Sequence, residues 1–487
     1  MKANLEQRLA GLAGHPALAA VLALSPDRVF LVGGAVRDLI LGRPARDLDL
    51  AVAGLTSELA ERAAGWLGVK AVTLGRWPQI VYRFVLPDLT LDLGPLDGAI
   101  EADLARRDLT INALALDLKS LDRSGIIDCG RGRRDLEEGI VRFVSEQAVL
   151  DDPLRLLRLF RFSAALNFKP DPESLTLVRR RASMINRSAG ERLREELLLL
   201  LSAPNCRPVI LAMLETGLWE ALIPETTPLR DCRQGGFHHL DVLDHTLLAL
   251  ARLEEFLADP NLACPGHVPE IKAYLANSFR PALLKLTVLF HDLGKPAARS
   301  EDATGVHFFG HEKIGEKTAA DLAGKLKLSG EETDLVRLLV KNHLRPFHLW
   351  ETRLSGRLTT RALYRLGRDL GDHLWGLVLH ALADAAATAG PDQVDRGGLP
   401  AFQTFILEIL GEIRKQKLAL ATQPRLLGGR DLMAAFNLKP SPLLGRILEA
   451  ILEEQALGRV TDRGQALALA ETLIESLSQN NSPIASR

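Results

Sequence analysis

The hydrophobic pattern changes once along the chain, near residue 150, and this change limits the possible folds more than any other feature. Before it, short apolar runs typical of strands alternate with helical stretches. After it, apolar residues recur at intervals of three and four, with Leu and Ala dominating. We therefore expect an α+β domain at the N-terminus and all-α domains after it. Breaks rich in Pro and Gly, together with the motifs below, divide the chain into 1–150, 151–225, 226–395 and 396–487.

The composition indicates a globular protein and excludes several other classes. The 487 residues are 47% hydrophobic and 25% charged, which rules out a disordered chain or a collagen. Because the net charge is −1, any nucleic-acid surface must be a local basic patch. The four cysteines form no C-x-x-C pair, which argues against a disulfide framework or a thiolate zinc site. No apolar run approaches the roughly 18–20 residues needed to span a bilayer, and we interpret Pro16–Leu24 as a short amphipathic helix of a cytoplasmic protein.

Two carboxylates, Asp47 and Asp49, open an apolar run that is typical of a strand. Because strand side chains alternate, both carboxylates face the same way, with Cα atoms roughly 6.5–7 Å apart, while Leu48 enters the core. Such a pair can hold two divalent cations about 3.5–4 Å apart, the arrangement used for nucleotidyl transfer. An isolated pair is more often a solvated edge, but a glycine turn and a helix precede this one closely and favour the metal site. Asp92, between two leucines, is a candidate third carboxylate.

Glycine and arginine residues near these carboxylates indicate a phosphate-binding surface. A strand expected over 28–32 ends at Gly33 and Gly34, and such a turn lets backbone N–H groups approach phosphate oxygens at the start of the next helix. Arg106 and Arg107 precede a stretch with the pattern of a strand. Their guanidiniums suit a triphosphate, since Arg binds phosphate in bidentate fashion.

A second basic feature follows at the start of the helical region. Asp152 is expected to cap a helix that has Pro153 at its first position. On this helix Arg155, Arg158 and Arg161 recur every three residues and form one basic stripe beside an apolar one.

Taken together, these motifs resemble those of the class II tRNA nucleotidyltransferases, the CCA-adding enzymes and their poly(A) polymerase relatives. The shared motifs are G-G-x-V-R-D from Gly33, D-x-D from Asp47, R-R-D-x-T-I-N-A from Arg106, D-P-x-R-x-L-R-x-x-R-F from Asp152 and, more loosely, E-R-x-x-E-E-L from Glu191. The resemblance implies a polymerase-β-like nucleotidyltransferase palm over 1–150 and a helical neck that binds nucleotide and RNA over 151–225. It also implies the following nucleotide-binding residues: Gly33, Gly34, Arg37, Arg106, Arg107, Asp108, Asn112, Asp152, Arg155, Arg158 and Arg161.

The chemistry of Asp152 and Arg155 suggests how such an enzyme could choose bases without a nucleic-acid template. A carboxylate accepts hydrogen bonds and a guanidinium donates them. Side by side, at positions i and i+3, they would match the amine and ring acceptor that cytosine and adenine share. Uracil and guanine present the reverse pattern and would be rejected. The plainer alternative is a capping Asp with an i,i+3 ion pair.

The implied reaction is attack of a tRNA 3′-hydroxyl on the α-phosphate of CTP or ATP, with two Mg²⁺ held by the catalytic residues Asp47 and Asp49. The connection over 93–105 is short, whereas CCA-adding enzymes of this family often have a longer loop there. Full CCA addition, CC-only or A-only addition and poly(A) polymerase activity therefore stay open.

Histidines cluster in the middle of the chain, with eleven of the twelve between His238 and His380. The segment resembles the HD phosphohydrolase superfamily, which implies a divalent-metal site, possible ions such as Ni²⁺ or Mn²⁺, and phosphatase or 2′,3′-cyclic phosphodiesterase activity. A metal-free relic scaffold is the alternative. A rival from another class is an HD phosphohydrolase whose front domain only senses nucleotides. The implied ligands are His245, His291, Asp292, His311, His343 and Asp384.

The remaining helical segments carry weaker indications of RNA binding. Arg179–Arg181 suits a neck that faces phosphates, although such a run is more often a solvated helix face. The tail resembles the C-terminal segment of HD-containing relatives, with caps expected at Asp431 and at Thr461–Asp462, and residues 478–487 should fray.

Overall fold

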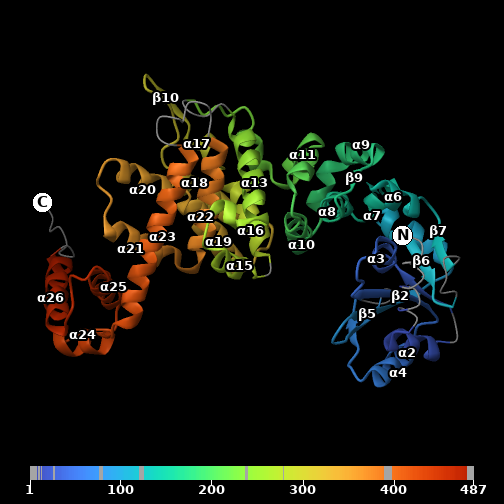
Figure 1. The fold of residues 1–487 in the computed structure, drawn as a ribbon. Helices are drawn as coiled ribbons and strands as arrows, with labels where there is room; N and C mark the ends of the chain where they lie inside the picture. The colour runs from blue at the N-terminus through green and yellow to red at the C-terminus, as the bar shows by residue number, and fades with distance from the viewer. Residues whose placement is uncertain are drawn as a thin grey trace, which may run out of the picture. The chain divides into compact units, whose positions relative to one another are not determined.

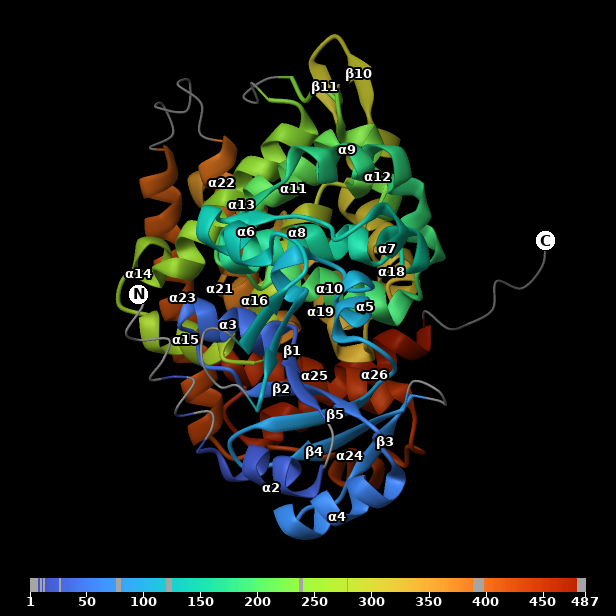
Figure 2. The same cartoon turned by 90° about the vertical axis from the view of Figure 1, so that its right-hand side faces the viewer.

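The computed structural model of the chain describes residues 8, 11, 14–25, 28–75, 80–119, 125–235, 240–277, 279–388 and 398–479. Two compact units account for the chain (Figures 1 and 2). Unit 1 comprises Met1–Thr227 together with Lys325–Leu328, and unit 2 comprises Pro228–Gly324 together with Ser329–Arg487. The finer division into four domains stays a prediction.

Unit 1 contains a seven-stranded sheet in the order β3-β4-β5-β2-β1-β6-β7. Among the described strands, β2 and β5 pair in parallel, and the other neighbours pair antiparallel. The strands are β1 Val29–Val32, β2 Asp47–Ala53, β3 Val72–Leu74, β4 Val81–Val85, β5 Thr90–Leu96, β6 Leu114–Asp117 and β7 Ile126–Asp128. A small parallel pair, β8 Ile140–Val141 with β9 Lys169–Pro170, lies outside this sheet.

The apolar runs at the front of the chain form strands as expected, and these are β1, β2, β4 and β5. One expectation is wrong in detail. The stretch after Arg107 does not enter a strand at once, because Thr110–Asn112 form a buried 3₁₀ turn and β6 begins only at Leu114. This turn places the Asn112 side chain next to Asp108, whereas a regular strand would have carried the chain away.

Alternation of side chains along β2 explains why its two carboxylates lie on one face of the sheet. Leu48 and Leu50 are each 2% exposed and pack into the interior, while Asp47 and Asp49 are exposed on the opposite face. β2 is an interior strand, because it lies between β5 and β1 in the sheet, and β1 is buried along its whole length. The expected common orientation of the two carboxylates is confirmed.

Helices cover the sheet and continue the chain within unit 1. Helix α3 packs on β1, β2 and β6, α2 packs on α4, and α8 packs on α10. Pro16–Leu24 forms the expected helix, now α2. The helices are α2 Pro16–Leu24, α3 Gly34–Leu41, α4 Ser57–Leu67, α5 Ile100–Ala105, α6 Gly132–Glu138, α7 Glu146–Asp151, α8 Arg155–Leu166, α9 Pro172–Arg181, α10 Gly190–Leu201, α11 Arg207–Glu215 and α12 Leu218–Leu222.

Unit 1 also includes the short segment Lys325–Leu328. This segment contacts the start of α10 so closely that a Cβ added to Gly190 would lie 2.5 Å from the Lys325 carbonyl oxygen. The Lys325 ammonium also forms an ion pair with Glu225. Gly190 is thus the residue that lets the two segments touch.

The described residues of unit 2 form helices and one hairpin, β10 Ser300–Asp302 with β11 Gly305–His307. Helix α13 packs on α16 and α22, and α16 packs on α19 (Figure 1). The helices are α13 Val242–Ala258, α14 Pro260–Ala263, α15 Val268–Leu275, α16 Arg280–Phe290, α17 Lys295–Ala298, α18 His311–Lys325, α19 Gly330–Asn342, α20 Arg345–Leu354, α21 Thr360–Leu370, α22 Leu374–Thr388, α23 Gly398–Thr422, α24 Gly429–Phe436, α25 Pro442–Ala456 and α26 Arg463–Gln479.

The last three helices form their own small core, which includes Leu432, Ile447 and Ala466. The expected cap at Asp431 is wrong by three residues. Gly428 is the N-cap of α24, and Asp431 lies in the first turn, where it accepts the Gly428 N–H (2.7 Å). Asp462 accepts the Gln465 N–H (2.9 Å) at the start of α26, as expected of a cap. The fraying expected over 478–487 falls mostly outside the described residues.

Within the described parts of the chain, we find no helix that combines the length and apolar character needed to cross a membrane.

Candidate active site and histidine–aspartate centre

The three candidate carboxylates gather on adjacent strands of the sheet. The parallel pairing of β2 with β5 places Asp49 directly opposite Asp92, and Asp47 lies two residues earlier on β2. The Asp49 side chain is accessible to solvent, yet the surrounding protein partly desolvates it. This desolvation, together with the negative charges of Asp92 and Asp47, raises the pKa of Asp49. Clustered carboxylates whose charges repel in this way suit a divalent cation, which would compensate them.

The three carboxylates differ in how they are already engaged. Arg83 on β4 binds Asp92 through two hydrogen bonds, from Nε (2.9 Å) and Nη2 (2.7 Å). Asp92 is therefore already paired with a guanidinium, and its role as a third metal ligand stays a prediction. Asp47 and Asp49 have no ion-pair or hydrogen-bond partner among the described residues. The D-x-D pair thus offers the donor set that Mg²⁺ prefers.

Gly33 forms the turn between β1 and α3 with φ 73° and ψ −134°, a conformation that a side chain would strain. A Cβ at this position would lie 2.8 Å from Arg107 Nη1 and 3.8 Å from Asp49 Oδ2. The Gly33 N–H donates to the carbonyl of Leu114 (3.0 Å), so it is already used. Gly33 therefore brings the backbone close to Arg107 and Asp49, and its own N–H is not the phosphate donor that the sequence suggested.

Arg106 and Arg107 share one counter-charge. Both guanidiniums contact Asp103 on α5, each at 3.0 Å. The Arg106 side chain is 63% exposed and that of Arg107 is 25% exposed. One carboxylate between two arginines leaves net positive charge beside Asp49. Asp103 was missed by sequence reasoning, although its i,i+4 spacing from Arg107 was a signal.

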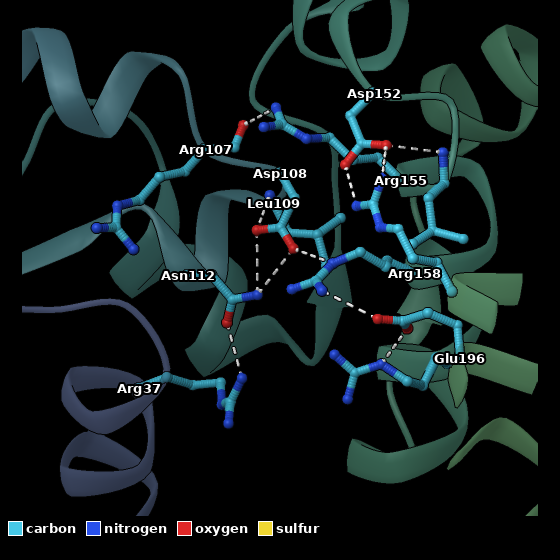
Figure 3. A network of polar contacts seen from close by, with 12 residues as sticks. Arg37, Arg107, Asp108, Leu109, Asn112, Asp152, Arg155, Arg158 and Glu196 are labelled. Atoms are coloured by element: carbon cyan, nitrogen blue, oxygen red, sulfur yellow. Dashed lines mark hydrogen bonds and ion pairs between the residues drawn. The ribbon is translucent and has the colours of Figure 1, made fainter. Parts of the chain in front are cut away.

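Asp108 is the centre of a buried network (Figure 3). It accepts hydrogen bonds from the Leu109 N–H (2.7 Å), Asn112 Nδ2 (3.2 Å) and Arg158 Nε (2.7 Å). Burial alone would raise the pKa of Asp108, but the charge and hydrogen bonds of Arg158 and the other donors hold it below its ordinary value. Asn112 in turn accepts from Arg37 Nη1 (2.7 Å). These hydrogen bonds link Arg37, Asn112, Asp108 and Arg158 into one network.

The expected basic stripe on α8 is not an open surface, because its arginines are engaged. Arg158 also contacts Glu196 on α10 (2.9 Å), and Arg161 contacts the other oxygen of the same carboxylate (2.6 Å). Arg155 Nη1 donates to the backbone carbonyls of Arg106 (2.7 Å) and Arg107 (3.1 Å). These contacts connect α8 to α10 and to the Arg106–Arg107 segment. Glu196 lies in the loosest of the motifs and was not predicted as a site residue.

Asp152 differs from its expected role in two ways. It does not cap α8 at the first turn, since Leu154 is the N-cap and Asp152 accepts the Leu154 N–H (3.3 Å) from outside the helix. Its ion-pair partner is Arg192 on α10, at 2.7 and 3.1 Å, rather than Arg155. Partial burial opposes ionisation, but Arg192 and the nearby charge of Arg155 lower the pKa of Asp152. Asp152 therefore stays an acceptor-only carboxylate.

In unit 2, all six expected ligands come together at the meeting point of five helices and their ends. They form two buried groups of three, and in each group the ligand atoms lie within 4.8 Å of one another. Asp292 belongs to one group and also lies 3.0 Å from His291 Nε2 in the other, so the groups adjoin. The groups are His245, His291 and Asp384, and Asp292, His311 and His343.

Backbone carbonyls orient three of the histidine rings. The Nδ1 atoms of His291, His311 and His343 lie 2.7, 2.8 and 2.6 Å from carbonyl oxygens three residues earlier. These contacts place the proton on Nδ1 and direct the lone pair of Nε2 into the cluster, as in metal sites. Lys295 also contacts Asp292 (2.7 Å). The chemistry and orientation of the donor set fit divalent metal ions.

Sequence reasoning missed His380, a seventh polar side chain of this cluster. Its ring centroid lies 5.1 Å from that of His291 and 6.0 Å from that of His343. His380 is 2% exposed, and neither ring nitrogen has a hydrogen-bond partner in the described structure. Burial and the neighbouring histidines hold its pKa well below the ordinary value, so the ring is neutral. Its position four residues before Asp384 on α22 was the signal that could have found it.

Comparisons with known proteins identify the class of the chain. The family model "Poly A polymerase head domain" matches residues 29–86 and 90–142, the model "Probable RNA and SrmB- binding site of polymerase A" matches 167–229, and the model "HD domain" matches 242–370. The chain belongs to the tRNA nucleotidyltransferase and poly(A) polymerase family and carries an HD domain. The resemblance seen in the sequence motifs is thereby confirmed, and so is the fold class.

Curated relatives match almost the whole chain. The chain is 32% identical to the A-adding tRNA nucleotidyltransferase of Deinococcus radiodurans, covering 92% of this chain and 96% of the relative. It is 33% identical to the CC-adding tRNA nucleotidyltransferase of Thermus thermophilus, covering 91% and 93%. Among solved structures, the Thermotoga maritima CCA-adding enzyme complexed with tRNA has the same fold, with a TM-score of 0.57, 22% identity and coverage of 92% and 91%.

Proposed function

We propose that this chain adds C, A or both to the 3′ end of tRNA, using CTP and ATP, by template-independent nucleotidyl transfer. The observation that carries the proposal is the unpaired Asp47–Asp49 carboxylate pair on β2, beside Gly33 and Arg107, in a chain of this family. The relatives that match along almost the whole chain are named for this reaction. Because tRNA and nucleoside triphosphates are available in the cytoplasm, we place the activity there.

In the proposed reaction the 3′-hydroxyl oxygen attacks the α-phosphorus, the bond to the bridging oxygen breaks and pyrophosphate leaves. Asp47 and Asp49 would hold two Mg²⁺ ions, which acidify the hydroxyl and neutralise charge on the leaving group. Arg107 lies next to the carboxylates and would contact the phosphates. Arg106, the more exposed of the pair, would bind the outer end of the triphosphate.

We propose that base choice depends on Asp152 and Arg155, with Arg192 as a positioning residue. The ionised Asp152 would accept a hydrogen bond from the exocyclic amine of C or A, and Arg155 would donate to the ring acceptor. The ion pair with Arg192 supports this role, because it fixes the carboxylate and keeps it deprotonated. Arg155 uses Nη1 for backbone carbonyls and keeps other N–H groups for a base.

The number of nucleotides added is best tested with defined tRNA ends. The short connection from β5 to α5, Asp97–Ala99, and the relatives named A-adding and CC-adding both favour a partial reaction. Transcripts ending at the discriminator base, at C or at CC would be incubated with CTP and ATP separately, and the products sized. Extension of none of them would contradict the proposal. Continued A addition to any RNA end would support poly(A) polymerase activity.

We also propose that the HD centre binds divalent metal ions and hydrolyses a phosphate ester. The observation that favours this second activity is the convergence of six buried ligands with oriented Nε2 atoms. Metal analysis of the purified protein, followed by phosphatase and 2′,3′-cyclic phosphodiesterase assays with Ni²⁺ or Mn²⁺, tests it. Absence of bound metal and of hydrolysis would instead support a scaffold role.

A further inference from the structure

A separate pocket of about 590 Å³ lies in unit 2, among α15, α22, α23 and the start of α16. It shares no residue with the two ligand groups of the HD centre. Its volume falls in the range of small-molecule sites, which run from about 300 to 1,000 Å³. None of its lining residues belongs to the proposed nucleotidyl-transfer site.

One wall of the pocket is aromatic and apolar. The Trp375 indole on α22 is partly exposed, and its centroid lies 5.3 Å from the His267 ring at an angle of 48°. Leu374, Leu410 and Ile413 extend this surface with aliphatic side chains. A flat aromatic surface continued by aliphatic groups suits a planar heteroaromatic ring, since indole is a strong stacking partner.

The rim of the pocket carries an excess of positive charge. Three cations, Arg280, Arg414 and Lys417, line it together with the carboxylates Glu270 and Asp372. Glu270 lies 3.6 Å from Arg414 and offsets that charge. Lys417 is exposed and has no ion-pair partner in the described part of the chain. The rim can therefore hold an anionic group.

The Tyr274 side chain lines the pocket, and its buried hydroxyl lies next to Gly376. Tyr274 is 9% exposed, and its hydroxyl makes no hydrogen bond of normal geometry among the described residues. The Arg280 guanidinium lies over the ring, 4.5 Å from its centroid. A Cβ at Gly376 would lie 2.5 Å from the hydroxyl, so the glycine makes room for it. Burial raises the pKa of Tyr274, which keeps the hydroxyl protonated and able to donate.

We propose that this pocket binds a nucleotide. Its base lies against Trp375 and the aliphatic wall, and its phosphate lies at Arg280 and Lys417. The same chemistry is present in a free nucleotide and in an unpaired nucleotide of an RNA chain, and the experiment below distinguishes these two sources.

The test measures binding to the full chain by isothermal titration without added divalent ions. The probes are 5′-UMP, 5′-GMP and an unpaired hexauridylate, whose bases do not match the Asp152–Arg155 pattern. The Lys417→Glu variant should weaken binding by about tenfold, because it turns an attraction into a repulsion. Lys415→Glu is the control, since Lys415 is exposed on the same helix and pairs with Glu412, and neither residue lines the pocket. Trp375→Leu should weaken binding by at least about fivefold.

If the mononucleotides bind, and the Lys417 and Trp375 variants weaken that binding, the ligand is a free nucleotide. If only the hexauridylate binds, the ligand is an RNA segment. The proposal is overturned if no probe binds below about 1 mM, or if the Lys417 and Lys415 variants bind equally well. Nucleotide addition to tRNA is assayed in the same preparations. Since Lys417 lies outside that machinery, failure of one proposal is distinguishable from failure of the other.

Discussion

Replacement of Glu196 by Gln should loosen the contact between α8 and α10. The Glu196 side chain is 8% exposed and faces two guanidiniums, those of Arg158 and Arg161, which are 31% and 16% exposed. Removing one partner of a buried ion pair costs about 3–5 kcal/mol. The amide keeps one acceptor, and Arg158 keeps its bond to Asp108, so we expect a loss of about 2–3 kcal/mol.

Hydrogen exchange of peptides from α8 and α10 measures this loss separately from any change in unit 2. Glu195→Gln is the matched control, because Glu195 is the exposed neighbour on the same helix. It should change the free energy of opening by no more than about 0.5 kcal/mol. Equal protection in the two variants would refute the assignment of Glu196 as the counter-charge of the α8 arginines. Because Arg158 also binds Asp108, the KM for CTP or ATP should rise in the Glu196 variant alone.

Three further outcomes are expected. Asp49→Ala should lower nucleotide addition by at least about a hundredfold while tRNA binding, measured by filter retention, stays near wild type; retained turnover would contradict the metal assignment. The pKa of Asp108 is below its unfolded value near 3.8, so its carboxylate stabilises the fold above about pH 4 and this contribution is lost as the pH falls. The stability difference between wild type and Asp108→Asn should therefore shrink between about pH 5 and pH 3 in urea titrations, and a constant difference would exclude this linkage. His380→Ala should weaken metal binding about 10- to 100-fold in competition with a chelator, whereas the exposed control His348→Ala should not.

Local sequence patterns were sufficient for features that depend on neighbouring residues. The orientation of Asp47 and Asp49 follows from strand alternation, and β2 confirms it. The six HD ligands were placed by motif order, and the structure brings them together. Spacing along the chain determines the first outcome, whereas the HD ligands lie on five helices and their ends and were found through the resemblance to a known family.

The pairing of charged groups could not be predicted in this way. Arg83 meets Asp92 because β4 and β5 pair in one register, and Arg192 meets Asp152 across 40 positions of sequence. A one-residue change of register would send Arg83 to the opposite face of the sheet. The basic stripe of α8 appeared open in sequence because the buried carboxylate that neutralises it lies on another helix.

The contribution of Lys325–Leu328 to unit 1 has a practical consequence for dissecting the chain. A single cleavage after Thr227 would yield an N-terminal fragment whose Gly190 had lost its packing neighbour and whose Glu225 had lost its cation. The C-terminal fragment would retain Lys325–Leu328, whose packing partner lies in the N-terminal fragment. If the two halves are expressed separately, Lys325–Leu328 should therefore be grafted onto the N-terminal half. Without this graft, the isolated half should be less active than it is in the intact enzyme.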